Sequence, residues 1–125
     1  MSKVIVQECK NYDVETLIEK INSAVASLGG WDKYIKPKDK VLLKVNLIGP
    51  KSSDTAAVTH SEFVRAMVRI LKENKCDVWI GDSSGGAIAG VAPTAQSFKV
   101  AGYEQVAEEE GAEIKNFDRE GVMSV

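Results

Sequence analysis

Polar residues with chemically useful side chains follow two apolar runs of the sequence. Lys44 and Asn46 lie at the end of the run 41–45, and Asp82 follows the run 78–80. Open parallel α/β sheets bind ligands outside the carboxyl ends of their strands. A cation, an amide and a carboxylate would then meet at one edge, which predicts a site for a polar or anionic small ligand. The candidate ligand-binding residues are Lys44, Asn46, Thr59, His60, Asp82, Ser83, Ser84, Gly85 and Gly86.

Three of these residues have more than one interpretation. Lys44 interrupts an apolar run, where a buried charge is costly unless it is paired. It therefore faces a ligand or an ion-pair partner, or it lies at an edge from which its ammonium reaches water. Asn46 either supplies an amide to the site or only terminates the strand. Asp82 could accept a ligand hydroxyl, bind a metal, pair with Lys44 or order its own turn.

The segment 81–90 is rich in glycine and serine. Ser83, Ser84, Gly85 and Gly86 would expose backbone N–H groups that can cradle an anion. The segment matches neither GxGxxG nor GxxxxGK[ST], so a surface loop without a ligand is the alternative. No Ser-His-Asp, HExxH or paired-carboxylate signature is present, which ranks an independent hydrolase or transferase lowest.

Thr59 to Glu62 match a capping box at the start of a helix, in which these two residues satisfy each other's backbone donors. His60, the single histidine of the sequence, would lie near the positive end of the helix dipole, which favours its neutral form. A neutral imidazole could act as a base or as a ligand. A surface histidine without a fixed partner is the alternative.

The charge and cysteine content exclude several classes of function. A net charge of −2 over 125 residues provides no concentrated positive field for a nucleic-acid or membrane-surface binder. Arg65, Arg69 and Lys72 fall on one helix face, which we expect to be solvated. Cys9 and Cys76 are expected to be buried reduced thiols. Without a CxxC motif, this chain alone forms no standard zinc or iron–sulfur site.

The N-terminus lacks the apolar region of a secretory signal, and no later run approaches the ~20 apolar residues of a membrane span. The cytoplasm is therefore the expected location.

Alternating strand and helix patterns predict an α/β fold. In chain order the predicted elements are a strand at 4–6, a helix at 14–28, a strand at 41–45, a helix from 59, a strand at 78–80, a helical stretch from 93 that is interrupted near 102 and ends at 111, and a strand at 112–117. Such alternation favours parallel strands with right-handed crossovers. We predict a single domain, residues 1–125, with a three-layer, Rossmann-like or flavodoxin-like architecture: a mostly parallel sheet with helices on both faces.

Four short motifs together resemble a known family. They are Leu-Leu-Lys-Val-Asn-Leu at 42–47, Thr-His at 59–60, a strand ending in Gly-Asp-Ser at 81–83, and Ala-Gly-Tyr at 101–103. In this order they are similar to the N-terminal part of the iron–sulfur-associated family known as domain of unknown function 362, over residues 2–118. Val45 stands where that family usually has proline, so the turn after Lys44 is expected to be less rigid.

The resemblance implies an N-terminal fragment of a longer bacterial or archaeal protein with a redox-linked role. It implies no cofactor within the fragment itself, and a ferredoxin-like, cysteine-rich segment with a [4Fe–4S] cluster in the remainder of the chain. By the same analogy the site candidates are Lys44, Asn46, His60, Asp82 and Ser83.

Two functions from different classes fit these observations. The first is a redox-associated domain that binds a polar or anionic small ligand at the strand edge and works beside the rest of its own chain. The second is a non-catalytic docking or homo-oligomerisation module, which the apolar residues from Val122 onward motivate.

Overall fold

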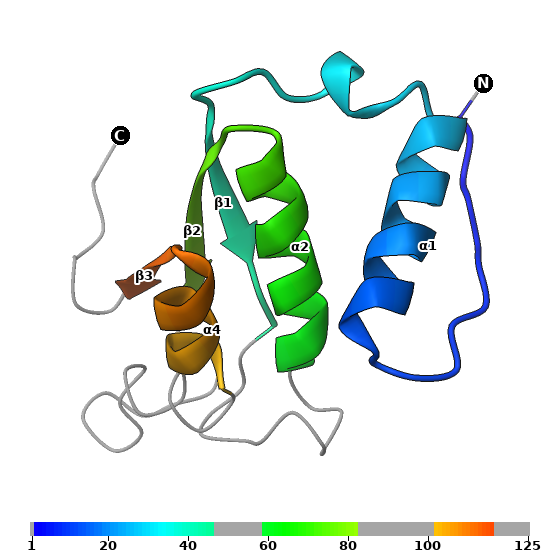
Figure 1. Cartoon of the computed structure of the whole chain (residues 1–125). Coiled ribbons are helices and arrows are strands. Elements are labelled where there is room, and N and C mark those ends of the chain that lie inside the picture. The colour runs from blue at the N-terminus through cyan, green and yellow to red at the C-terminus, as the bar shows by residue number, and fades with distance from the viewer. Residues whose placement is uncertain (1, 47–58, 83–101, 117–125) are drawn as a thin grey trace.

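Three parallel strands form an open sheet in the part of the chain that the computed structural model describes, residues 2–46, 59–82 and 102–116. The strand order is β1-β2-β3, and both neighbouring pairs are parallel (Figure 1). The elements in chain order are α1 (Val14–Ser27), η1 (Trp31–Lys33), β1 (Lys40–Lys44), α2 (Ser61–Glu73), β2 (Asp77–Asp82), α4 (Tyr103–Glu110) and β3 (Glu113–Asn116). The predicted α/β class and the parallel sheet are confirmed.

The core lies between the sheet and helices α2 and α4. Val78 and Ile80 of β2 are 3% and 0% exposed, and they pack in one cluster with Val64 and Val68 of α2. Helix α2 contacts α1 on one side and α4 on the other (Figure 1). Because right-handed crossovers join strands that follow one another across the sheet, the two connecting helices lie on the same face.

The opposite face of the sheet carries an apolar centre flanked by cations. Leu42 and Trp79 are register partners, and side-chain alternation along the strands directs both away from the core. Leu42 is 42% exposed. The Trp79 ring lies near the ammonium groups of Lys40 and Lys115, 5.7 and 4.6 Å from its centre. The predicted architecture has helices on both faces of the sheet, and the second helix layer would cover this face. The described residues include no helix of that layer.

Helix α1 follows the predicted apolar stripe. The Asp13 carboxylate caps its start by accepting bonds from the Thr16 N–H at 3.1 Å and the Thr16 hydroxyl at 2.8 Å, which lower the pKa of Asp13. The helix ends before Gly30, where φ is 87° and the N–H bonds the Val25 carbonyl at 2.9 Å. Leu17 is the residue of α1 that is buried. The contact surface between α1 and α2 is therefore narrow.

The strand predicted at 4–6 is not formed. Residues 2–10 are extended but pair with no strand of the described part, and Val4 and Val6 are 80% and 90% exposed. Figure 1 shows this segment on the side of α1 that faces away from α2. A β-branched run has strand propensity, but a strand also needs a neighbour that supplies backbone partners.

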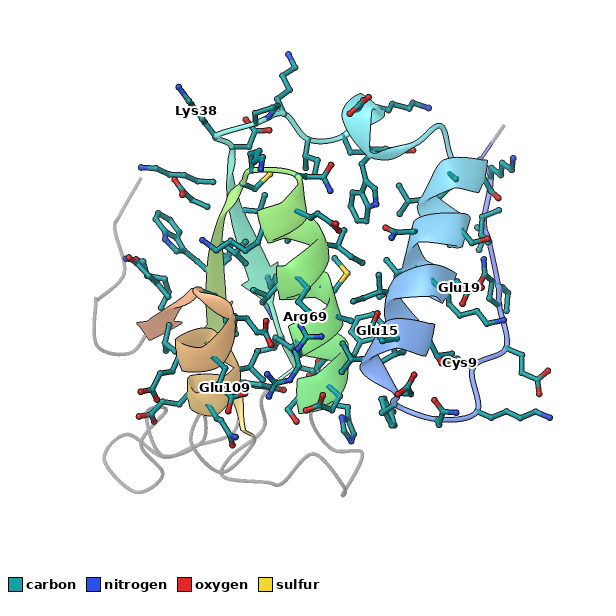
Figure 2. The ribbon with its side chains drawn as sticks, viewed as in Figure 1. Cys9, Glu15, Glu19, Lys38, Arg69 and Glu109 are labelled. Atoms are coloured by element: carbon teal, nitrogen blue, oxygen red, sulfur yellow. The ribbon has the colours of Figure 1, made fainter. Side chains whose placement is uncertain are left out.

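The two cysteines lie in different environments. Cys76 is 3% exposed, and burial, helped by the carboxylates of Asp39 and Asp77, raises the pKa of its thiol. The predicted buried thiol is therefore confirmed at Cys76. The prediction is wrong for Cys9, which is exposed on the N-terminal segment (Figure 2), because that segment does not join the sheet.

An ion-pair network joins α2 to both neighbouring helices. The Arg65 side chain, which is 12% exposed, contacts Glu109 at 2.6 Å and Glu110 at 2.7 Å on α4. Arg69 contacts Glu110 at 3.0 Å and Glu15 of α1 at 3.5 Å (Figure 2). Burial disfavours the charged guanidinium of Arg65, but hydrogen bonds to Glu110 and Glu109 outweigh burial and raise its pKa.

The predicted solvated face of α2 is wrong for Arg65, whereas Arg69 and Lys72 are exposed as predicted. Periodicity correctly places the arginines away from the apolar stripe. It cannot show that another helix presents carboxylates on that side.

Candidate functional site

The carboxyl ends of β1 and β2 lie side by side at one rim of the sheet. The register pairs Lys44 with Gly81, and Gly81 with Lys115. The Val45 N–H also donates to the Gly81 carbonyl at 3.2 Å. The expected proximity of residues 44–46 to the end of β2 is therefore confirmed. The side chain of Asp82, and Ser83, Ser84, Gly85 and Gly86 as a whole, lie outside the described residues.

Lys44 is exposed at this rim, and its charge is not buried. Along β1, Lys40, Leu42 and Lys44 are exposed while the residues between them are partly buried. Lys44 therefore lies on the outward side of a strand whose two faces differ. This alternation corrects the prediction of a charge inside a buried run, because a residue on the outward face pays no large desolvation cost.

Asn46 and Thr59 hold the end of β1 against the start of α2. The Asn46 N–H donates to Thr59 Oγ1 at 2.9 Å, and the Thr59 N–H donates back to the Asn46 carbonyl at 3.1 Å. The predicted capping box is therefore wrong, because the Thr59 hydroxyl is engaged with the preceding strand. The Glu62 carboxylate contacts Arg65 instead, at 3.1 Å. Both site candidates thus have a positioning role at the rim.

His60 is the actual N-cap of α2. Its Nδ1 accepts a bond from the Glu62 N–H at 3.1 Å. The ring stacks on Tyr12 with centroids 3.7 Å apart and planes within 10°. His60 is therefore half-buried with fixed partners, and the alternative of a surface histidine without a partner is wrong.

Tyr103 ties the start of α4 to the same rim. It is 0% exposed, and its hydroxyl donates a short bond to the Thr59 carbonyl. Gly102, with φ of 91°, approaches α2 so closely that a Cβ there would lie 3.2 Å from Ser61 Cβ. The starts of α2 and α4 are thus adjacent. Tyr103 was a motif match in the sequence, and its positioning role could be found only from the structure.

Replacing Tyr103 with phenylalanine is expected to lower the free energy of unfolding by about 1–2 kcal/mol, because the Thr59 carbonyl loses a buried donor. It should also broaden or shift the backbone amide signals of Asn46 and Thr59 in a heteronuclear NMR spectrum. Tyr34→Phe is the matched control, since its hydroxyl bonds a carbonyl, that of Leu28, at an exposed position. Equal effects of the two variants would contradict the positioning role.

No three of the described side chains of the types His, Cys, Asp and Glu gather into a group that could hold a metal ion. None of the described helices is long and apolar enough to cross a membrane.

Comparison with known proteins identifies the family of this chain. The family model for the domain of unknown function DUF362 matches residues 41–125. The thylakoid-associated protein sll1697 of Synechocystis sp. is 31% identical over 84 residues, and the match spans 66% of this chain but only 26% of that protein. No solved structure matches the chain. This chain belongs to the DUF362 family.

Proposed function

We propose that the rim formed by the carboxyl ends of β1 and β2 binds a small anionic ligand. One observation carries the proposal: the β1 end with Lys44 and Asn46 and the starts of α2 and α4 converge there. Helix starts expose backbone donors and the positive end of the helix dipole. Lys44 would supply the charge, Asn46 would donate a hydrogen bond, and Asp82 would accept one from a hydroxyl group of the ligand.

His60 forms part of the boundary of the proposed site, at the start of α2. Its Nδ1 accepts a bond from the Glu62 N–H, and the Tyr12 ring covers one face of the imidazole. These two contacts hold the ring in one orientation. We therefore assign His60 a positioning role at the rim, while Lys44 suits an oxyanion such as phosphate or a carboxylate.

The proposal extends to a redox-associated role beside an iron–sulfur module. The residues of this chain do not fit a [4Fe–4S] cluster by themselves, because such a cluster takes four thiolates and the sequence has two cysteines. Cys76 is buried in the core and Cys9 is distant in sequence. We therefore assign any iron–sulfur cluster to a further part of the polypeptide, which would be the principal partner of this domain. We also propose that the protein is located in the cytoplasm.

Lys44→Ala tests the proposed site. We expect it to weaken the binding of inorganic phosphate, followed by NMR titration at constant ionic strength, by about tenfold, which is the effect of losing one charge-assisted bond. The melting temperature should hardly change, because Lys44 is exposed.

Lys40→Ala is the matched control for this titration. Lys40 lies on the same strand and the same exposed face, at the opposite end of β1. Its removal should leave phosphate binding unchanged. Equal weakening in both variants, or a lower melting temperature as the main effect of Lys44→Ala, would contradict the proposal.

The second candidate is a docking or homo-oligomerisation module. The exposed Leu42 and the Trp79 beside it on the outer sheet face favour this candidate. The residues from Val122 that first suggested it lie outside the described part. Sedimentation velocity separates the two functions: a monomer at all concentrations that binds phosphate supports the first, and a concentration-dependent dimer supports the second.

A further inference from the structure

The outer edge of β1 is open in the part of the chain that the structure describes. There β1 pairs with β2 on one side, and its other side has no strand partner. An open edge presents a row of unpaired backbone donors and acceptors, which proteins usually pair or cover. The edge of β1 therefore has the chemistry of a strand-binding site.

Helix α1 lies where a crossover helix from a strand at this edge would lie. It packs beside α2 in the helix layer, and its start is at the same end of the molecule as the start of α2, because Tyr12 stacks on His60. Figure 1 shows α1 roughly antiparallel to β1, on the outer side of α2. A right-handed connection to β1 from a parallel strand at its open edge requires this placement.

The N-terminal segment already runs in the direction that such a strand needs. Lys3 contacts the Ser27 carbonyl at 2.7 Å, near the end of α1, and Tyr12 lies at the opposite end of the helix. The segment is thus extended in the same sense as β1, with α1 between the two (Figure 1). Its Val4 and Val6 side chains are 80% and 90% exposed, so the observed position leaves two β-branched side chains in water.

We propose that the open edge of β1 is a strand-binding site and that residues 3–7 of the same chain occupy it in a second arrangement, as a fourth parallel strand. The move removes apolar surface from water and pairs the edge. It breaks few contacts, chiefly the exposed bond from Lys3 and the contacts of the Gln7 amide with the Lys20 carbonyl and the Ala24 N–H, each at 3.2 Å. The same chain is favoured over a second copy because its tethered segment is present at high effective concentration.

Amide hydrogen exchange of the unmodified chain tests the proposal directly. In the observed position the amides of residues 3–7 have no backbone partner among the described residues, and they should exchange at nearly the rate of an unfolded peptide. In the strand position alternate amides in this segment should be protected by about tenfold or more. Uniformly fast exchange across residues 3–7 would overturn the proposal.

The double variant V4D/V6D provides a second, independent measurement. Exposed substitutions usually have little effect on stability, so the observed arrangement alone predicts an unchanged melting temperature. The strand arrangement predicts a decrease of about 5 °C or more, and a smaller decrease for V4T/V6T, which keeps the β-branched shape. An unchanged melting temperature in V4D/V6D would overturn the proposal. Protection that disappears on dilution, together with a dimer in sedimentation, would overturn the assignment to the same chain.

Discussion

Replacing Arg65 with alanine should lower the free energy of unfolding by about 3 kcal/mol, the lower end of the scale for removing one partner of a buried ion pair, because Arg65 and Glu110 are the largely buried members of the network. Arg65 is 12% exposed and contacts the carboxylates of Glu62, Glu109 and Glu110. Without the guanidinium, these acidic groups would repel one another at the junction of α2 and α4. Because α4 carries Tyr103, the loss should also loosen the rim.

Urea unfolding followed by circular dichroism measures this effect. Lys72→Ala is the matched control, because Lys72 lies on the same helix and is exposed, and it should change the free energy by no more than about 0.5 kcal/mol. Arg69→Ala should fall between the two, since the Arg69 side chain is 42% exposed. A loss below about 1 kcal/mol for Arg65→Ala would show that the network contributes little.

The same network makes stability depend on pH. Hydrogen bonds from Arg69 and then Arg65 lower the pKa of Glu110 below that of an ordinary glutamate, although burial opposes the shift. A carboxyl whose pKa is lower in the folded state stabilises the fold above its unfolded pKa, and this contribution is lost as the pH falls through the folded value. Stability should therefore decrease from about pH 5 downward.

The Glu110→Gln variant isolates this contribution. It should be less stable than the unmodified chain at pH 7, and the difference should shrink as the pH falls below about 4. Glu108→Gln is the matched control, because Glu108 is exposed on the same helix. A stability difference that stayed constant from pH 7 to pH 3 would contradict a role for the Glu110 charge.

Replacing Gly81 with valine should lower the free energy of unfolding by about 3 kcal/mol, the upper range for overpacking a filled site. A Cβ at Gly81 would lie 3.0 Å from Leu42 Cδ1 and 3.1 Å from the Lys115 carbonyl oxygen. The first neighbour can rotate away, but the second is backbone of the adjacent strand. A branched side chain should therefore displace β3 from β2.

Thermal unfolding and amide exchange in β3 together check this result. Gly81→Ala should have a smaller effect than Gly81→Val, because the alanine methyl group requires a shift of only a few tenths of an ångström. We expect β3 amides such as that of Ile114 to exchange faster in Gly81→Val. Unchanged protection of β3 would mean that the sheet accommodates the side chain elsewhere.

Much of the fold could be read from local patterns. The apolar stripe from Val14 with Asp13 before it predicts α1, and the glycines after it predict its end, because capping and periodicity act within a few residues. Strand and helix alternation likewise predicts the parallel sheet, and the parallel sheet predicts that Lys44 and the end of β2 share one rim. These predictions are confirmed.

The partners of individual side chains could not be read in this way. The Thr59 hydroxyl has two competing partners, the Glu62 backbone N–H at the start of α2 and the Asn46 N–H after the end of β1. Only packing selects the second. The same holds for Arg65, whose carboxylate partners on α4 lie more than 40 positions away. Local patterns cannot rank contacts between elements whose separation is unknown.

The sequence by itself determined most of the segments that become helices and strands, and the end of the sheet at which polar residues gather, because propensity and crossover handedness are local or topological rules. The tertiary structure decided that His60 caps α2 and stacks on Tyr12, that Tyr103 fastens α4 to Thr59, and that residues 4–6 lie outside the sheet. Each of these features depends on contacts between residues that are far apart in the sequence. Such contacts are decided only when the elements pack.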